Sequence, residues 1–384
     1  MDACAGRTDE LKMTFGSRIL MTIVFVPAVS ISTWQISLAA SPGKEEAQEQ
    51  GSRFRGALLS AKQVTESRLS SLKSAGVQAV ALQLRNGAGA RITERQACER
   101  IQQSNLALYY WIEVARCPEL ADAHPASMAS LQGHSQWRRL FNDPPTPRDD
   151  EVVKTYPWVP ILNKEPFQQQ LRRVQELLED RPQPKGVFLN DLQGAPSACG
   201  CGNHLCRWTT DYGKIRTVTP LGNDAPAAFV AAVEKLVPQS NVIPVWTTEC
   251  EEHDVAKDGL CAGVGCFKGT CWRVYTAQLM PVAKRSQTLG VLLPYRSFQR
   301  DLPIYGDKAG WIIHAVKSFQ DMPVRHQGQP IAASRLITVL QGWDVTDQQV
   351  ALQIDVANKA GVAGFLVAYA KIEQGWQPRI LKWK

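Results

Sequence analysis

Five acidic residues follow closely on short apolar runs of the sequence, at positions where predicted β-strands end. They are Glu113, Asp191, Glu249, Asp344 and Glu373. Hydrolysis of a glycosidic bond needs two carboxyl groups: one donates a proton to the leaving oxygen, and the other attacks the anomeric carbon or activates water. Two carboxyl groups held together in a partly dry site have pKa values pushed apart, which suits them to these two roles. A single acid at a strand end is often merely solvated, so the set as a whole favours a shared site.

Aromatic side chains accompany these acids on or just past the same runs. Flat rings offer apolar faces that suit sugar rings, and the indole N–H adds a polar handle. Half or more of such rings pack in the core of any fold, so the aromatic residues support the acids without identifying a site alone. The residues expected to contact a carbohydrate substrate are Trp111, Glu113, Asn190, Trp246, Tyr295, Trp343 and Glu373.

The cysteines are concentrated in two loops. The first loop holds Cys199, Cys201 and Cys206, and the second holds Cys250, Cys261, Cys266 and Cys271. In an exported protein such clusters predict disulfides. The alternative is a structural zinc ion held by the three thiolates of the first loop, with a fourth ligand from His204, Cys250 or His253. No other cofactor is expected.

Two smaller groups of reactive side chains have open interpretations. Residues 249–254, ECEEHD, are dense in metal-binding side chains and could serve a metal-dependent hydrolase through Glu249, Glu251, His253 and Asp254. A solvated turn would have the same composition. Cys98 and Cys117 flank the third apolar run, either as buried thiols or as a bridge.

Eight apolar runs alternate with helical patterns from Phe54 onward, which predicts parallel strands that are buried on both faces. The runs are Gly56–Ser60, Val77–Leu84, Leu106–Val114, Gly186–Asp191, Val242–Thr247, Gly290–Pro294, Leu336–Gln341 and Val362–Ala370. Thr65 and Asp224 are candidate helix caps, and Thr346 with Gln349 can form a capping box.

This count predicts a (β/α)8 TIM barrel with long loops after its third to sixth strands, on the face where such barrels carry their active sites. A doubly wound open sheet is the alternative, but no G-x-G-x-x-G follows the first strand. The long segment Ala115–Tyr156 is either a lid over the mouth or a surface excursion.

Residues 1–40 predict a secretory signal peptide and therefore export to the periplasm or the extracellular space. Arg18 precedes the apolar run Ile19–Val29, and small residues follow at Ala39 and Ala40, as in a secretory signal peptide. The true start could be Met13, and an uncleaved membrane anchor is the competing interpretation. Residues 41–53 are polar and predict a disordered linker, so the barrel domain is expected to span residues 54–384.

Charge and composition exclude some partners. The formal net charge is +7 and the hydrophobic fraction is 44%, an ordinary globular balance. The basic residues are scattered and form no dense stripe, which argues against a nucleic-acid partner. The mild positive charge would suit an anionic polymer, although simple solubility explains it as well.

The segments around the third and fourth expected strands resemble glycosyl-hydrolase barrels distantly related to the alpha-amylase group, which carry a cysteine-rich loop after strand four. The matching pieces are His124-Pro125, a helix over Glu165–Asp180, GVFLND ending at Asp191, and the loop CGCGNHLC. The resemblance covers about half the chain. It implies a nucleophile at Asp191, an acid/base at Glu249 and a stabilising carboxylate at Asp344.

The sequence departs from that family at three places. Leu189 stands where an Arg is usual two residues before the nucleophile, Ala126-Ser127 replace a Glu-Trp pair, and the cysteine spacing is longer by two residues. These departures concern catalysis more than fold. The sequence therefore predicts an exported glycoside hydrolase, with a non-catalytic carbohydrate-binding barrel and the metal-dependent hydrolase as alternatives.

Overall fold

A closed barrel of eight parallel strands is the core of the computed structural model, which confirms the (β/α)8 prediction. The structure describes residues 53–85, 88–128, 146, 148, 151–154, 159–192, 221–247, 276–293, 309–372 and 379–382. The strands are β1 Phe54–Leu59, β2 Ala79–Gln83, β3 Ala107–Glu113, β5 Gly186–Asn190, β6 Asn241–Thr247, β7 Leu289–Leu293, β8 Leu336–Gln341 and β9 Gly364–Ala368. They pair in that order, and β9 closes the barrel by pairing with β1.

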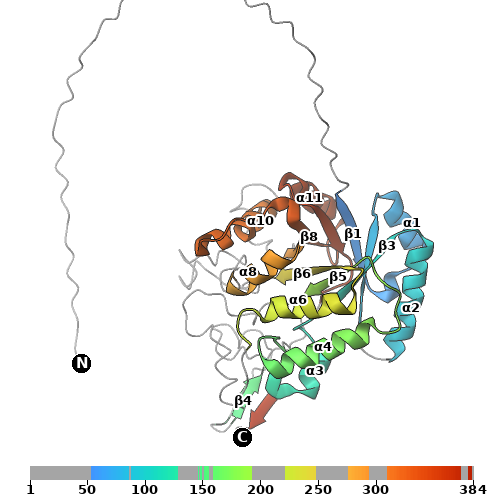
Figure 1. Ribbon diagram of the computed structural model, residues 1–384. Coiled ribbons are helices and arrows are strands. Elements are labelled where there is room, and N and C mark those ends of the chain that lie inside the picture. The colour runs from blue at the N-terminus through green and yellow to red at the C-terminus, as the bar shows by residue number, and fades with distance from the viewer. Residues whose placement is uncertain are drawn as a thin grey trace, which may run out of the picture. The chain divides into compact units, whose positions relative to one another are not determined.

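Helices run along the outside of the strands (Figure 1). They are α1 Glu66–Ser74, α2 Ala88–Gln103, α3 Pro118–Ala123, α4 Lys164–Leu178, α6 Ala225–Leu236, α8 Thr276–Arg285, α10 Trp311–Asp321 and α11 Asp347–Lys359. Short 3-10 turns lie at Ala61–Gln63, Pro125–Ser127, Pro323–His326 and Ala333–Arg335. Within the described residues, no helix combines the length and the apolar character needed to cross a membrane.

Two of the three predicted helix starts are confirmed in detail. Thr65 accepts a hydrogen bond from the Arg68 backbone N–H, and Thr346 forms the predicted capping box with Gln349. Asp224 precedes α6 as predicted but makes no side-chain cap bond, because its backbone is already helical, with φ −82° and ψ −9°, rather than extended as a capping residue requires.

The core has two layers separated by the strands. Inside the barrel, Tyr109 and Phe188 pack with ring centroids 5.7 Å apart, and Trp111 and Phe54 pack against the same Phe188 ring. The outer layer lies between the strands and the helices and includes Trp246 among its buried side chains. Successive residues of a strand point to opposite faces, so β3 alternates between these two layers.

A second, two-stranded sheet was not predicted. β4, Glu151–Lys154, pairs antiparallel with β10, Arg379–Lys382. Each strand is four residues long and neither has a continuous apolar pattern, so local sequence carries little signal for it. In the segment that was expected to be a lid or an excursion, the described residues form α3, the 3-10 turn at Pro125–Ser127 and β4.

Replacing Gly364 with alanine is expected to destabilise the barrel by about 1–3 kcal/mol. A Cβ atom at Gly364 would lie 2.1 Å from the Phe54 carbonyl oxygen, so the backbone of β1 would have to move. Urea unfolding followed by tryptophan fluorescence measures the effect. Gly89→Ala is the control, because nothing lies within 4 Å of its added Cβ and alanine favours the helix. An equal response of the two variants would contradict the prediction.

Candidate functional site

Three of the expected substrate-binding residues form one hydrogen-bonded network at the carboxyl ends of two neighbouring strands. Glu113 is the last residue of β3 and lies in register with Asn190, the last residue of β5. The Trp111 indole N–H donates to Glu113 Oε1 at 2.7 Å, and the Asn190 Nδ2 amide donates to Glu113 Oε2 at 2.7 Å. The network therefore joins the two strands at the barrel mouth.

This arrangement fixes the orientation of the Glu113 carboxylate. Trp111 and Asn190 are buried, whereas Glu113 is only half-buried. The two donors therefore hold the carboxylate from its buried side. Each carboxylate oxygen accepts a hydrogen bond from a different strand, which limits rotation of the carboxyl group. Glu113 is thus arranged to stabilise positive charge, to attack an electrophilic carbon or to accept a proton.

The backbone behind Glu113 is also held on both sides. The Glu113 carbonyl oxygen accepts a hydrogen bond from Arg173 Nη2 of α4 at 2.7 Å. On the other side, the Val114 backbone N–H donates to the Asn190 carbonyl at 2.9 Å, which extends the β3–β5 ladder past the last strand residue. Positioning by fixed partners of this kind is what a functional carboxylate requires.

Asp191 lies in a buried ion pair. Arg116 Nε is 3.0 Å from Asp191 Oδ2, and the side chains are 3% and 0% exposed. Asp191 also has a left-handed backbone with φ +60°, directly after β5. A nucleophile must reach the substrate, and this carboxylate does not reach solvent. The structure therefore places Asp191 in the wall of the mouth, where its charge offsets that of Arg116.

Asp344 and the other two tryptophans of the expected site have different surroundings. The Asp344 side chain is 52% exposed, and Oδ2 lies 3.9 Å from Nζ of Lys371. Trp343 is half-buried against the inner core layer, and its carbonyl accepts a hydrogen bond from Gln341 at 2.9 Å. Trp246 is fully buried in the outer layer, between strands and helices, and its ring does not line the mouth.

Several expected site residues lie outside the described residues. They are Glu249, Tyr295, Glu373, Cys199, Cys201 and Cys206, together with the rest of both cysteine loops. Within the described part of the chain, no group of three or more His, Cys, Asp or Glu residues is arranged to hold a metal ion.

Cys98 and Cys117, for which a bridge was one alternative, are both buried as thiols. Cys98 Sγ lies 3.5 Å from the Tyr110 hydroxyl, and Cys117 Sγ lies 3.5 Å from Glu119 Oε2. Burial raises the pKa of both thiols. The protonated form of a thiol is the unreactive one, so these two cysteines are structural.

Sequence reasoning missed two amides and one cation that take part in the mouth. Gln83 and Gln341 are the last residues of β2 and β8, and both are buried. They follow Ala81 and Val339, two residues earlier on the inner face, so strand alternation puts them on the same face as Glu113. A search for polar residues at strand ends, not only for acids, would have found both. The sequence around Arg116 does not indicate its role, because its partner Asp191 is distant in sequence.

Comparison with known proteins adds no family. No protein-family model and no curated protein matches this sequence. Among solved structures, the chain is similar to an endo-1,4-beta-D-mannanase from Thermotoga petrophila RKU-1, with 11% identity, coverage of 84% of this chain and 90% of that chain, and a TM-score of 0.41. It is also similar to a broad-specificity endoglucanase from Clostridium longisporum, with 9% identity, coverage of 79% and 75%, and a TM-score of 0.39. A beta-1,4-mannanase from the sea hare Aplysia kurodai matches with 10% identity, coverage of 79% and 80%, and a TM-score of 0.36. These likenesses are too distant to indicate a substrate, and the fold is established by this chain's own strand pairing.

Proposed function

We propose that the barrel mouth binds a glycan and hydrolyses a glycosidic bond, with Glu113 as the carboxylate that acts at the anomeric centre. The observation that carries the proposal is the pair of 2.7 Å hydrogen bonds from Trp111 and Asn190 to the two oxygens of Glu113. They hold one oriented carboxylate at the end of the barrel where this fold carries its active sites. The Trp111 ring itself is buried, so it supports the site from below.

The second carboxyl group of the proposed reaction is Glu249. It follows β6, which is two strands from β3 in the barrel order β3-β5-β6. Neighbouring strands are about 4.8 Å apart, so two steps place the ends of β3 and β6 roughly 10 Å apart. Paired carboxyl groups in glycosidases are separated by about 5–9.5 Å. Glu113 then serves as nucleophile or base, and Glu249 as the proton donor.

Asp191 and Asp344 have supporting roles in this proposal. The buried pair of Asp191 with Arg116 stiffens the turn after Asn190, one residue from the network. Asp344 stands half-exposed at the end of β8 and contributes charge to the rim. These roles differ from those that the amylase-like resemblance implies, and the burial of the Asp191 carboxylate beside Arg116 is the reason for choosing them.

A non-catalytic carbohydrate-binding barrel is the second candidate. One observation favours it: among the inward-facing strand ends that the structure describes, Gln83, Asn190 and Gln341 are amides and only Glu113 is an acid. Amides recognise hydroxyl groups by donating and accepting hydrogen bonds, and they do not transfer protons. A mouth of this composition binds a sugar even if the second carboxylate is absent.

The proposal includes location and partners. We place the protein outside the cytoplasm, on the grounds of Arg18 and the apolar run Ile19–Val29. Oxidising conditions there suit disulfides in the two cysteine loops, with structural zinc as the alternative. The proposed reaction uses no cofactor.

A combined turnover and binding screen tests the proposal. The protein, folded under oxidising conditions, is incubated with a panel of polysaccharides and aryl glycosides. Released reducing ends and retention of glycan on the protein are then measured. Turnover supports the hydrolase, and retention without turnover supports the binding barrel. The absence of both across neutral, acidic and basic glycans would overturn the proposal.

A further inference from the structure

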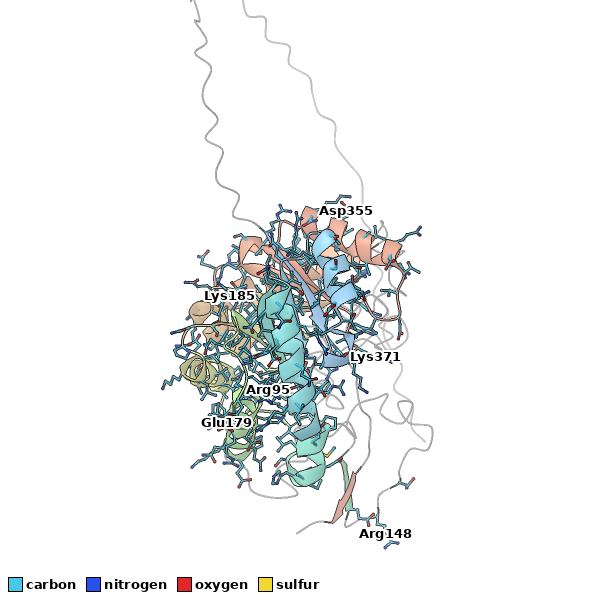
Figure 2. All side chains as sticks on the ribbon, turned by 90° about the vertical axis from the view of Figure 1, so that its right-hand side faces the viewer. Arg95, Arg148, Glu179, Lys185, Asp355 and Lys371 are labelled. Atoms are coloured by element: carbon cyan, nitrogen blue, oxygen red, sulfur yellow. The ribbon has the colours of Figure 1, made fainter. Side chains whose placement is uncertain are left out.

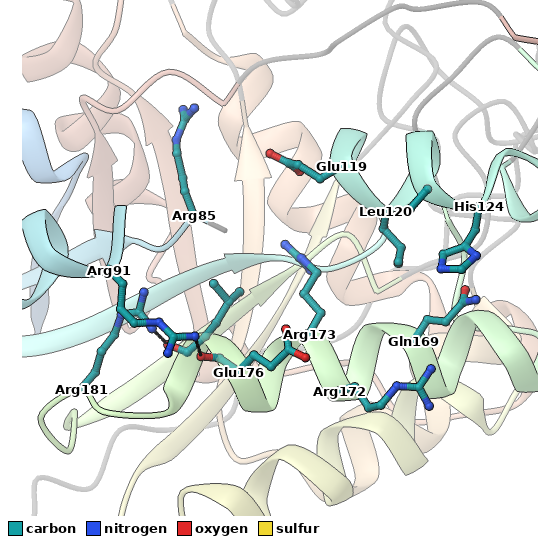
Figure 3. A pocket seen from close by; sticks show the side chains of 12 residues that line it. Arg85, Arg91, Glu119, Leu120, His124, Gln169, Arg172, Arg173, Glu176 and Arg181 are labelled. Atoms are coloured by element: carbon teal, nitrogen blue, oxygen red, sulfur yellow. Dashed lines mark hydrogen bonds between the residues drawn. The ribbon is translucent and has the colours of Figure 1, made fainter. Parts of the chain in front are cut away.

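A second pocket, distinct from the barrel mouth, lies between α2, α3 and α4. Its volume is about 340 Å³. Five arginines line it, Arg85, Arg91, Arg172, Arg173 and Arg181, against the two carboxylates of Glu119 and Glu176. The Arg173 side chain rises from α4 toward the space between Arg85 and Glu119, and Arg172 lies along the same helix (Figure 3).

Two of these arginines have carboxylate partners. Arg181 is fully buried and pairs with Glu94 at 2.5 Å. Arg91 lies 3.8 Å from Asp180. These two guanidinium groups are therefore offset by charges of the fold and serve mainly as walls of the pocket.

The other three arginines form no ion pair within 4 Å among the residues that the structure describes, although Glu94 attracts Arg85 at longer range. The guanidinium groups of Arg85 and Arg173 donate to amide and carbonyl oxygens, and Arg172 is exposed. Neither Glu119 nor Glu176 lies within ion-pair distance of them. Three guanidinium groups, each positively charged at every physiological pH, thus share one cavity with the two carboxylates of Glu119 and Glu176, which leaves an excess of positive charge in the lining.

Arg173 is pre-organised for a ligand. Nη1 donates to Gln170 Oε1 at 2.9 Å and Nη2 donates to the Glu113 carbonyl at 2.7 Å, which holds the guanidinium plane in place. Each Nη atom carries a second N–H, and Arg173 lines the pocket, so an oxyanion held there can accept from this side chain.

We propose that this pocket binds a tetrahedral oxyanion, a sulfate or phosphate group. Guanidinium groups match the oxygens of such anions with paired hydrogen bonds. The cavity has room for one such group together with part of the molecule that carries it. The basic residues of the sequence form no stripe that would continue onto a nucleic acid. The group arrives either as a free ion or as a substituent of a glycan. Arg173 also contacts the Glu113 backbone, so the pocket borders the mouth, but the proposal does not depend on hydrolysis.

Isothermal titration with sodium sulfate and sodium phosphate, at constant ionic strength set by sodium chloride, tests the pocket. The variants are Arg85→Gln and Arg172→Gln, two exposed arginines whose replacement leaves the core intact. Each loses charge-assisted hydrogen bonds to the anion, and we expect each to weaken binding at least about tenfold. Arg95→Gln is the matched control, because Arg95 lies on the exposed side of α2 and outside the pocket lining (Figure 2).

The outcomes separate the alternatives. Saturable binding that is lost in both pocket variants and kept in Arg95→Gln supports the site. No saturable binding, or an equal loss in Arg95→Gln, would overturn it. A sulfated oligosaccharide and its unsulfated counterpart identify the source: tighter binding of the sulfated sugar than of free sulfate assigns a glycan substituent, and equal binding assigns the free ion. Repeating the titration in Glu113→Gln, where binding should persist, keeps this test independent of the proposed hydrolysis.

Discussion

Replacing Asp191 with asparagine is expected to lower the free energy of unfolding by about 3–5 kcal/mol, because it removes one partner of a buried ion pair. Arg116 and Asp191 are both sealed from solvent, with Nε 3.0 Å from Oδ2. Asparagine tolerates the left-handed backbone that Asp191 adopts, so the substitution changes the charge with little change in backbone strain. Urea unfolding followed by tryptophan fluorescence measures the loss.

A surface pair provides the control. Asp355 and Lys359 lie four residues apart on α11 at 2.8 Å, and both are more than half exposed. Exposed pairs contribute little, so Asp355→Asn should change stability by no more than about 0.5 kcal/mol. If Asp191→Asn were as mild as Asp355→Asn, Asp191 would have to be reconsidered as a residue that is available to a substrate.

A double variant tests the cause. Removing both charges, as in Asp191→Asn with Arg116→Met, avoids leaving one charge buried without its partner. We expect the double variant to be more stable than the sum of the two single losses predicts, and this difference is the coupling energy of the pair. Additive losses would show that Asp191 stabilises the turn by some route other than its contact with Arg116.

The barrel could be predicted because each of its strands and helices has a pattern that is visible within a short stretch of sequence. Each of the eight strands is a short apolar run between helical patterns, and that alternation survives without any knowledge of tertiary contacts. The two-stranded sheet could not be found in the same way. Glu151–Lys154 and Arg379–Lys382 pair across most of the chain, and nothing within either segment specifies the other.

The site could be predicted only in part, for a related reason. Strands that are buried on both faces have no polar alternation, so the sequence does not say which face a residue occupies. Trp246 was therefore expected to contact the substrate, but it lies in the outer layer. Trp111 lies in the inner layer. The ion pair of Asp191 joins residues that become neighbours only when β3 and β5 pair.

We therefore propose Glu113, rather than Asp191, as the carboxylate that acts on the substrate. Glu113 was expected to bind substrate, and its two hydrogen-bond donors give its carboxylate a fixed direction. The three residues Trp111, Glu113 and Asn190 were all among the expected contacts, so the residue types at strand ends were informative even where the assigned roles differed.

Replacing Glu113 with glutamine is expected to reduce kcat on a hydrolysed glycan by about 10²- to 10⁴-fold, the range for losing a positioned acid–base group. Glutamine keeps the shape of the side chain. Its oxygen can accept from Trp111, and its amide can donate to Asn190 once that amide is turned, so the network is kept while the charge is lost. Initial rates of reducing-end release measure the effect. Asp344→Asn removes a charge from another strand end, and its rate should remain within a few-fold of the original.

Azide can then show whether Glu113 takes part in the reaction or only lies near the reacting atoms. If Glu113 is the nucleophile of a retaining reaction, Glu113→Ala leaves a space beside the anomeric carbon, and azide can attack there as the leaving group departs, giving a glycosyl azide of inverted configuration. If Glu113 is instead a base that activates water, azide can replace water as the attacking group, because azide needs no base to remove a proton. The glycosyl azide then forms by attack from the face that water would have used. A Glu113→Ala variant that azide does not restore, together with a Glu113→Gln variant of normal rate, would remove Glu113 from the reaction and leave the mouth as a binding site.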